Sequence, residues 1–366
     1  MRYKGEVDIM SDKYGLITIH NTLNYGSLLQ TYSLYKAIES LGVDISLIDY
    51  QCEAIARREN TYSWRECRKP TDIIRHFTHY PVLNQVKVNM WKFMRENMKI
   101  TSMYNKNTIG KSQDLFDGYI VGSDIVWGLE ITGHDLNYML EFAGDNKRKL
   151  AFASSIGTKW MESEAERIGS ALSRFDFISV REQLAAEWVE EVVGQAVPVM
   201  CDPTMLFEST FWETFVETDY ALTKEYVLVY MCTRDKQNVR DAIAYAKKHK
   251  LDVYYLNFNR PENGIKNIKP VTAAQWITLF AKAKVVFSAS YHGLLFALYF
   301  QKRVFYYNRG NLSRMISFSK ELGITHREGT ADNLINDVSI DYNKVKVIIE
   351  QKRKYSWEIL KKELMK

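Results

Sequence analysis

A histidine and two serines stand between two apolar stretches near residue 290. The segment VVFSASYHGLLFALYF, residues 285–300, predicts a buried strand followed by a helix that is apolar on nearly every side. An ordinary turn at this point would contain more Gly, Pro, Asn or Asp. Ser288, Ser290 and His292-Gly293 therefore predict a ligand at the helix entrance, where the imidazole would donate to a phosphate or act as an acid or base. The alternative is a structural histidine.

The segment NYGS, residues 24–27, opens an earlier predicted helix. Free backbone N–H groups and the helix dipole favour an anion or a hydroxyl ligand at such a position. The alternative is that Asn24 or Ser27 only caps the helix, with Ser27 and Gln30 forming a capping box. Residue spacing alone does not distinguish a ligand site from a helix cap at this position.

Asp124 and Arg181 each follow an apolar segment that predicts a buried strand. Asp124, in GSD, has the chemistry of a base or of an acceptor for a sugar hydroxyl, and the alternative is a capped turn. The Arg181 guanidinium has the geometry to clamp a carboxylate or a phosphate. The alternative interpretation is that Arg181 lies on the surface and pairs with Glu182.

Several common catalytic and metal-binding motifs are absent from the sequence. There is no GxGxxG, so a nicotinamide site is not supported, and no GxxxxGK[ST], which excludes a P-loop. There is also no HExxH, no pair of cysteines at zinc-ligand spacing and no GxSxG. We therefore expect neither a metal site nor a serine hydrolase.

The composition is that of a globular protein, with 46% hydrophobic and 25% charged residues. Four widely spaced cysteines favour a reducing compartment over a disulfide scaffold. The first residues lack the apolar core of a signal peptide, and no apolar run is long enough for a spanning helix. We expect a cytoplasmic protein. The net charge of +5 fits an anionic small substrate, and we expect no nucleic-acid partner.

Strand and helix patterns alternate along most of the 366 residues, which indicates an α/β fold with parallel sheets covered by helices. We expect two Rossmann-like domains facing a cleft, at residues 1–210 and 222–342, and a long helix at 343–366. Polar clusters follow the strands in both halves, and ligands of open α/β sheets bind beyond the carboxyl ends of the strands. The predicted strands lie at residues 15–20, 44–50, 117–124, 149–155, 175–182, 197–203, 225–233, 252–258, 285–288 and 303–307.

Residues 52–115 interrupt this alternation and are rich in Arg, Lys and aromatic residues. We interpret them as a helical insertion in the first domain. Such a stretch is able to meet an anionic membrane surface, with Trp at the interface, or to bind nucleic acid. The alternative is a solvated insertion whose aromatic side chains face inward. Peripheral membrane contact through this region is the functional prediction that we retain.

Six segments together resemble the polysaccharide pyruvyl transferase family, in the order that the family shows. They are NYGSLLQTYSLYKAI, DGYIVGSDIVW, FASSIGT, FISVRE, CDPTMLF and FSASYHGLLFALYFQKRVFYYNRGNLSRM, and they span about residues 18–323. The resemblance implies a fold like that of GT-B glycosyltransferases. It also implies transfer of the three-carbon unit of phosphoenolpyruvate to a sugar, usually as a ketal, in cell-surface polysaccharide biosynthesis. In principle this chemistry requires no metal or other cofactor.

The resemblance implies roles for residues of this chain. Arg181 and His292 match positions that hold the donor, and Asn308 and Arg314 match a further polar segment near the cleft. The catalytic residues expected are His292 and Asp124. The donor-binding residues expected are Arg181, Ser288, Ser290, Gly293, Asn308 and Arg314. The acceptor-binding residues expected are Asn24, Tyr25, Gly26, Ser27, Gln30 and Ser123.

One position departs from the pattern, because several members of the family have Arg where this chain has Ser290. Arg314, Arg309 or Lys159 would have to supply the missing cation; otherwise the donor differs. Two other functions therefore stay open: a GT-B-type glycosyltransferase that uses a nucleotide sugar, and a non-catalytic glycan-binding protein. The partners expected are phosphoenolpyruvate and a sugar or lipid-linked glycan acceptor, at the inner face of the membrane if the insertion meets it.

Overall fold

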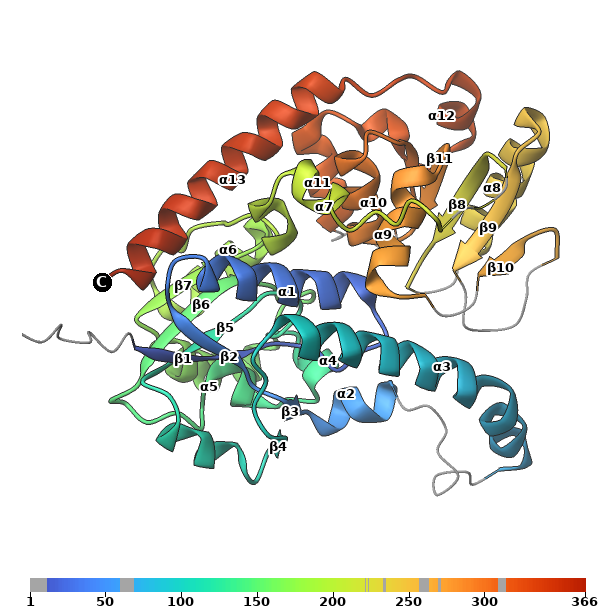
Figure 1. The fold of residues 1–366 in the computed structure, drawn as a ribbon. Coiled ribbons are helices and arrows are strands. Elements are labelled where there is room, and N and C mark those ends of the chain that lie inside the picture. Colours follow the sequence, from blue (N-terminus) through green and yellow to red (C-terminus); the bar gives the residue numbers. More distant parts are fainter. Residues whose placement is uncertain are drawn as a thin grey trace, which may run out of the picture.

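The computed structural model describes residues 12–59, 69–220, 222, 224–232, 235–256, 263–268, 271–308 and 314–366. Its described residues form two five-stranded parallel sheets, one in each half of the chain (Figure 1). Helices connect most of the successive strands, as is usual for parallel pairing. The predicted α/β class with two Rossmann-like domains is confirmed.

The N-terminal sheet has the strand order β2-β1-β5-β6-β7. Its strands are short and almost fully buried, because helices or the other domain cover both faces. They are β1 (Lys13–Ile17), β2 (Asp44–Leu47), β5 (Gly118–Val121), β6 (Arg148–Ser154) and β7 (Phe177–Val180). The helices of this half are α1 (Tyr25–Glu39), α4 (Leu129–Thr132), α5 (Ala165–Leu172), α6 (Gln183–Val193) and α7 (Ser209–Glu213).

The C-terminal sheet repeats this plan with the order β10-β9-β8-β11-β12. Its strands are β8 (Tyr226–Tyr230), β9 (Asp252–Leu256), β10 (Lys266–Ile268), β11 (Val285–Ser288) and β12 (Arg303–Tyr306). Its helices are α8 (Lys236–His249), α9 (Ala273–Lys282), α10 (Tyr291–Tyr299), α11 (Arg314–Leu322) and α12 (Ala331–Asn336). The predicted capping box between Thr272 and Gln275 is present at the start of α9.

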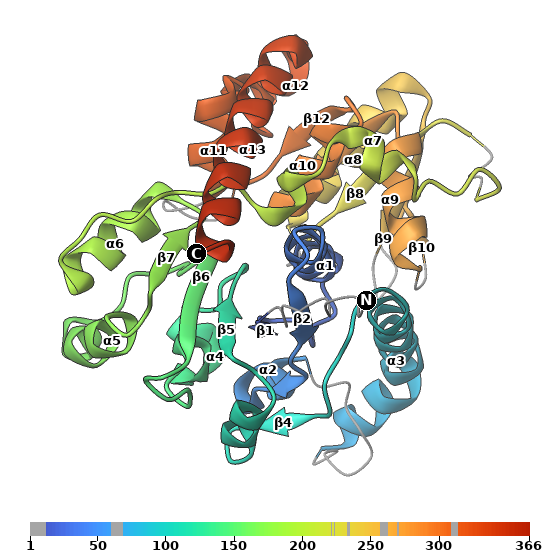
Figure 2. The ribbon, with the colours of Figure 1, turned by 60° about the vertical axis from the view of Figure 1, so that its left-hand side comes forward.

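Two helices connect the halves. Helix α1 lies between the two sheets, and its apolar residues share one core with those of α9 and α10. The long helix α13 (Tyr342–Leu364) starts beside the C-terminal domain and runs back over the N-terminal one (Figures 1 and 2). The predicted C-terminal helix is therefore confirmed, whereas the domain boundaries at 210 and 222 remain predictions.

The insertion is helical, as predicted. It contains α2 (Glu53–Arg58) and α3 (Pro70–Asn97), and a small parallel pair of strands, β3 (Tyr50–Gln51) and β4 (Tyr104–Asn105), joins its ends. Residues 60–68 of the insertion lie outside the described part. Helix α3 lies along the outside of the N-terminal domain (Figure 2).

Two local predictions are wrong. Residues 197–203 form no strand beyond an isolated bridge between Val199 and Val180, because Pro198 and Pro203 have no N–H group to extend a ladder. The α1 cap is Asn24, whose side chain accepts from the Gly26 N–H, so Ser27 and Gln30 lie inside the helix. Both errors concern segments that bear on the site.

Candidate active site

Arg181 lies at the centre of the candidate site, directly after β7, and its side chain is 1% exposed. Its Nη1 donates to the Asp202 carboxylate at 2.9 Å and to the Ser123 hydroxyl at 3.4 Å. Nε and Nη2 have no hydrogen-bond acceptor in the described chain, although carboxylate oxygens of Glu182 and Asp124 lie at 3.7 and 3.9 Å. Buried N–H groups are nearly always bonded, so these two nitrogens are unusual.

Asp202 joins Arg181 to the other domain. Its Oδ2 lies 3.2 Å from Nε2 of His292, in the first turn of α10, and its Oδ1 accepts from the backbone and the hydroxyl of Thr204. Burial alone would raise the pKa of the Asp202 carboxyl, but His292 and Arg181 hold that pKa well below its usual value. Asp202 is therefore an ionised carboxylate that lies between the Arg181 guanidinium and the His292 imidazole.

Sequence reasoning missed Asp202. The available signal was CDPT, an Asp followed by Pro at the end of an apolar segment, which is typical of the start of a helical turn. The structure confirms that role, since Asp202 caps a 3₁₀ turn at Pro203–Leu206.

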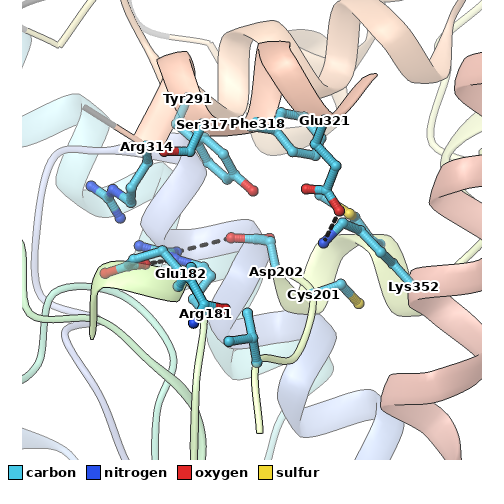
Figure 3. Close-up of a pocket in the computed structure, with 13 residues that line it drawn as sticks. Arg181, Glu182, Cys201, Asp202, Tyr291, Arg314, Ser317, Phe318, Glu321 and Lys352 are labelled. Carbon is cyan, nitrogen blue, oxygen red and sulfur yellow. Dashed lines mark hydrogen bonds and ion pairs between the residues drawn. The ribbon is translucent and has the colours of Figure 1, made fainter. Parts of the chain in front are cut away.

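A cavity of about 360 Å³ opens beside Arg181 at the junction of the domains (Figure 3). Three cations and three carboxyl groups line it, together with Tyr291 and apolar side chains. The cations are Arg181, Arg314 and Lys352, and the carboxyl groups are Glu182, Asp202 and Glu321. Lys352 pairs with Glu321 at 2.7 Å, and Arg181 pairs with Asp202 at 2.9 Å.

Glu182 is the second residue that the sequence reasoning passed over. Its Oε1 accepts from the Ser155 hydroxyl at 2.6 Å, whereas its buried Oε2 has no hydrogen-bond donor in the described chain. Burial raises the pKa of this carboxyl, although Arg181 and Ser155 act in the opposite direction. Among the residues that line the cavity, the pKa of the Glu182 carboxyl is thus raised and that of Asp202 is lowered.

These features agree with a match between this sequence and the sequence model of one family, polysaccharide pyruvyl transferase, over residues 24–311. The chain belongs to the polysaccharide pyruvyl transferase family. The match covers more than half of the chain and includes Arg181, Asp202 and His292. No curated protein matches the sequence.

Solved structures that resemble this pyruvyl transferase family member show its fold. A protein assigned as UDP-N-acetylglucosamine 2-epimerase from Listeria monocytogenes has a TM-score of 0.54 at 12% identity, over 94% of this chain and 91% of its own. The Neisseria meningitidis UDP-GlcNAc 2-epimerase bound to UDP-GlcNAc has a TM-score of 0.50 at 8% identity, over 95% of this chain and 94% of its own. S. aureus MnaA with UDP has a TM-score of 0.52 at 12% identity, over 95% of this chain and 90% of its own. These proteins establish a GT-B-like fold and nothing about substrates.

Ser290, where the resemblance led us to expect Arg, is a structural serine in this chain. Ser290 is the N-cap of α10, and the Ser288 hydroxyl donates to its carbonyl oxygen, so both serines stabilise the turn. Gly293 lies under this turn, where a Cβ would come within 2.3 Å of the Ser288 hydroxyl.

The three candidates for the missing cation lie in different places. Arg314 lines the cavity, with Cζ 5.8 Å from the Tyr291 ring centroid and Nη1 3.5 Å from the Ser155 hydroxyl. Lys159 instead pairs with Glu191 on the surface. Arg309 lies outside the described residues, and Asn308 follows β12 just before them.

The expected acceptor residues separate into two groups. Ser27 donates to Asp124, and Ser123 accepts from Arg181, so these residues adjoin the centre of the site. The others hold the structure: Asn24 caps α1, the Tyr25 hydroxyl donates to the Val271 carbonyl at 2.7 Å, and the Gln30 amide is fully buried. Gly26 lies against the His292 ring, because a Cβ there would come within 2.3 Å of Nδ1.

Within the described ranges, no cluster of His, Cys, Asp and Glu side chains has the arrangement of a metal site. Among the same residues, no helix combines the length and the apolar character needed to cross a bilayer.

Proposed function

We propose that this protein transfers the three-carbon unit of phosphoenolpyruvate to a sugar, as a ketal across two hydroxyl groups, in cell-surface polysaccharide biosynthesis. The observation that carries the proposal is Arg181, a buried guanidinium at the domain junction with two nitrogens that lack acceptors in the described chain. A planar carboxylate or a phosphate is the ligand that such a fork fits best.

Phosphoenolpyruvate carries both of these anionic groups on three carbons. Arg181 and Arg314 both approach Tyr291, with Cζ atoms 5.6 and 5.8 Å from the ring centroid, so two guanidinium groups border one small cavity. This arrangement supports a donor site in which one cation binds the carboxylate and the other the phosphate. In this proposal Arg314 supplies the cation that Ser290 does not.

The reaction needs an acid beside the donor and a base beside the acceptor. A proton adds to the methylene carbon, which becomes a methyl group, and an oxocarbenium-like centre forms at the neighbouring carbon. One sugar hydroxyl attacks this centre and loses its proton to the base. The second hydroxyl then displaces inorganic phosphate, which closes the ketal and releases the second proton.

We assign the acid to Glu182, which lines the cavity with an oxygen that has no donor in the described chain and with a raised pKa. Asp124 is the proposed base, because its Oδ1 lies 3.9 Å from Nη2 of Arg181 and its Oδ2 accepts from the Ser27 hydroxyl. His292, first expected to transfer the proton, faces Asp202 through Nε2 and Gly26 through Nδ1. In this proposal it positions Arg181 through Asp202.

The proposal extends to where the protein works. The acceptor would be a sugar or a lipid-linked glycan presented at the inner face of the membrane, and the protein would be cytoplasmic and peripheral. The acceptor-side residues Asp124 and Ser27 belong to the N-terminal domain, which also carries the basic insertion.

The test is a thermal-shift titration with phosphoenolpyruvate, run beside inorganic phosphate, pyruvate and UDP. A ligand that binds only the folded protein raises Tm as its concentration passes Kd. We expect a rise in Tm with phosphoenolpyruvate that is strongly reduced in Arg181→Lys, which keeps the charge but not the fork. The exposed Arg167→Lys is the matched control in the same domain. Arg181→Ala is a weaker choice, because it leaves Asp202 buried without its partner.

Stabilisation by UDP alone would contradict the donor assignment and favour a glycosyltransferase that uses a nucleotide sugar. Stabilisation by sugars, with no response to any donor and no release of phosphate from phosphoenolpyruvate, would favour the non-catalytic glycan-binding alternative.

A further inference from the structure

Helix α3 has two halves with different surroundings. In the C-terminal half Val86, Met90 and Met94 are buried in the main core. Before Val86, none of the α3 residues whose burial is described is buried. The first turns extend away from the body of the molecule (Figures 1 and 2). One half of the helix thus fixes the position of the other.

The extending half exposes large apolar side chains. Ile73, Ile74 and Phe77 are 40%, 61% and 67% exposed, and Val88 farther along is 50% exposed. At about 100° per residue, Ile73, Ile74 and Phe77 fall within an arc of about 100° on the helix. They therefore form one apolar face, which we call the α3 face. Neighbouring apolar residues exposed along one face, rather than scattered singly, mark an interaction site.

The insertion that contains this face is basic. Residues 52–115 contain twelve Lys and Arg against six Asp and Glu, an excess of six, whereas the whole chain has an excess of five. The rest of the protein is therefore slightly acidic, and the basic character is confined to this insertion. Lys87 and Lys92 of α3 are exposed beside the apolar residues. An apolar face flanked by cations is the combination that binds anionic lipid surfaces.

The helix also leads to the proposed acceptor side. Asn89 of α3 and Tyr25 of α1 both donate to the Val271 carbonyl, at 3.1 and 2.7 Å. Trp91 meets His20, which follows β1, edge to face at 5.8 Å. These contacts join the inner half of α3 to the first turn of α1, which includes Ser27.

We propose that the α3 face docks the protein on an anionic membrane surface, with Ile73, Ile74 and Phe77 in the interface and the lysines on lipid headgroups. This inference deepens the proposed function, because a lipid-linked acceptor would be met at that surface. Its test does not depend on that function, since docking is measured without donor or acceptor.

The experiment is cosedimentation of the full chain with vesicles of phosphatidylcholine alone and of phosphatidylcholine with phosphatidylglycerol in equal parts. We expect binding to the anionic vesicles only, weakened by salt. The double variant Ile74→Ser/Phe77→Ser should lower the partition coefficient about tenfold or more, because two apolar side chains no longer enter the interface. Lys87→Ala/Lys92→Ala should lower it by a similar factor on anionic vesicles.

The matched control is Ile335→Ser/Val338→Ser, which removes two side chains that are 73% and 54% exposed on and after α12. It should bind like the unchanged protein, and all variants should keep the same Tm. Equal binding to neutral vesicles, or full binding by the α3 double variant, would overturn the proposal. A doubled mass in solution that the α3 double variant abolishes, without vesicle binding, would assign the face to a second copy of the chain instead.

Discussion

The pKa values of two carboxyl groups that line one cavity are shifted in opposite directions because their neighbours differ. Asp202 accepts from Thr204 and lies between His292 and Arg181, which together outweigh the effect of its burial. Glu182 is also close to Arg181, but its Oε2 lies 3.7 Å from Nε and has no hydrogen-bond donor in the described chain. For this carboxyl the effect of burial exceeds that of Arg181, and its pKa is raised. Such a divergence is how one site provides both a permanent anion and a proton donor.

We predict that Glu182→Gln lowers the transfer rate by about 10²-fold or more, the usual contribution of a general acid. The amide still accepts from Ser155 but has no proton to give, so the loss should fall on kcat rather than on KM. The measurement is phosphate release from phosphoenolpyruvate as a function of pH, in which the alkaline decline of the rate should disappear. The exposed Glu187→Gln on α6 is the control.

The same variant should alter stability in a pH-dependent way. Because the folded pKa of Glu182 is raised, the folded state keeps a proton that the unfolded chain releases above about 4.3, its ordinary pKa. Stability from this group is therefore present at lower pH and is lost as pH rises through the folded pKa. The Glu182→Gln protein should have a higher Tm than the unchanged protein near neutral pH. Near pH 4 the two Tm values should differ little. A constant difference across that range would contradict the assignment.

Some of these residues were predictable from sequence and others were not, for a physical reason. Arg181 and His292 stand where an apolar strand pattern gives way to polar residues, and parallel sheets bring such positions to one edge. Asp202 was hidden because two prolines prevent the strand that it was expected to end. Its main partner, His292, is 90 residues away, and no local pattern encodes that pairing.

At the scale of elements, the site depends on the first turns of α1 and α10, which approach each other across the domain junction. Gly26 of α1 makes this possible, since its missing Cβ leaves room for the His292 ring. The helical spacing of α1 was readable, because apolar residues recur every three or four positions. That the helix would be buried on almost all sides, between two sheets, was not readable from its own residues.

Gly26→Ala should therefore impair the site although alanine is the better helix former. Its Cβ would lie 2.3 and 2.5 Å from two atoms of the His292 ring, so one helix must shift. Crowding of this kind costs about 1–3 kcal/mol, more than the roughly 1 kcal/mol gained in helix propensity. We expect a lower Tm and a smaller thermal shift with phosphoenolpyruvate.

The matched control for this substitution is Gly110→Ala. No heavy atom lies within 4 Å of a Cβ at that position, so stability and ligand response should be unchanged. A Gly26→Ala protein that responds to phosphoenolpyruvate like the unchanged one would show that contact between the two helices does not position the site.

At the scale of the whole molecule, α13 fixes the segment that carries Asp202. The Cys201 N–H donates to the Ser356 hydroxyl at 2.9 Å, and Trp357 and Arg353 donate to the carbonyls of Leu206 and Met205. Lys352 of the same helix lines the cavity. A long charged helix was predictable at this end of the chain, but its return over the N-terminal domain is a tertiary feature without a local signal.

Ser356→Ala tests this connection, because it removes the acceptor of a buried N–H group directly before Asp202. Leaving such a group unbonded costs about 1–3 kcal/mol, and we expect Tm to fall accordingly. If α13 holds Asp202 in place for Arg181, the affinity for phosphoenolpyruvate should fall as well, measured as a shift of the titration midpoint at a temperature where both proteins are folded. Exposed Lys354→Ala, on the same helix, should change neither quantity. A lower Tm with an unchanged midpoint would limit α13 to stability and leave Asp202 to be positioned by Thr204 and His292 alone.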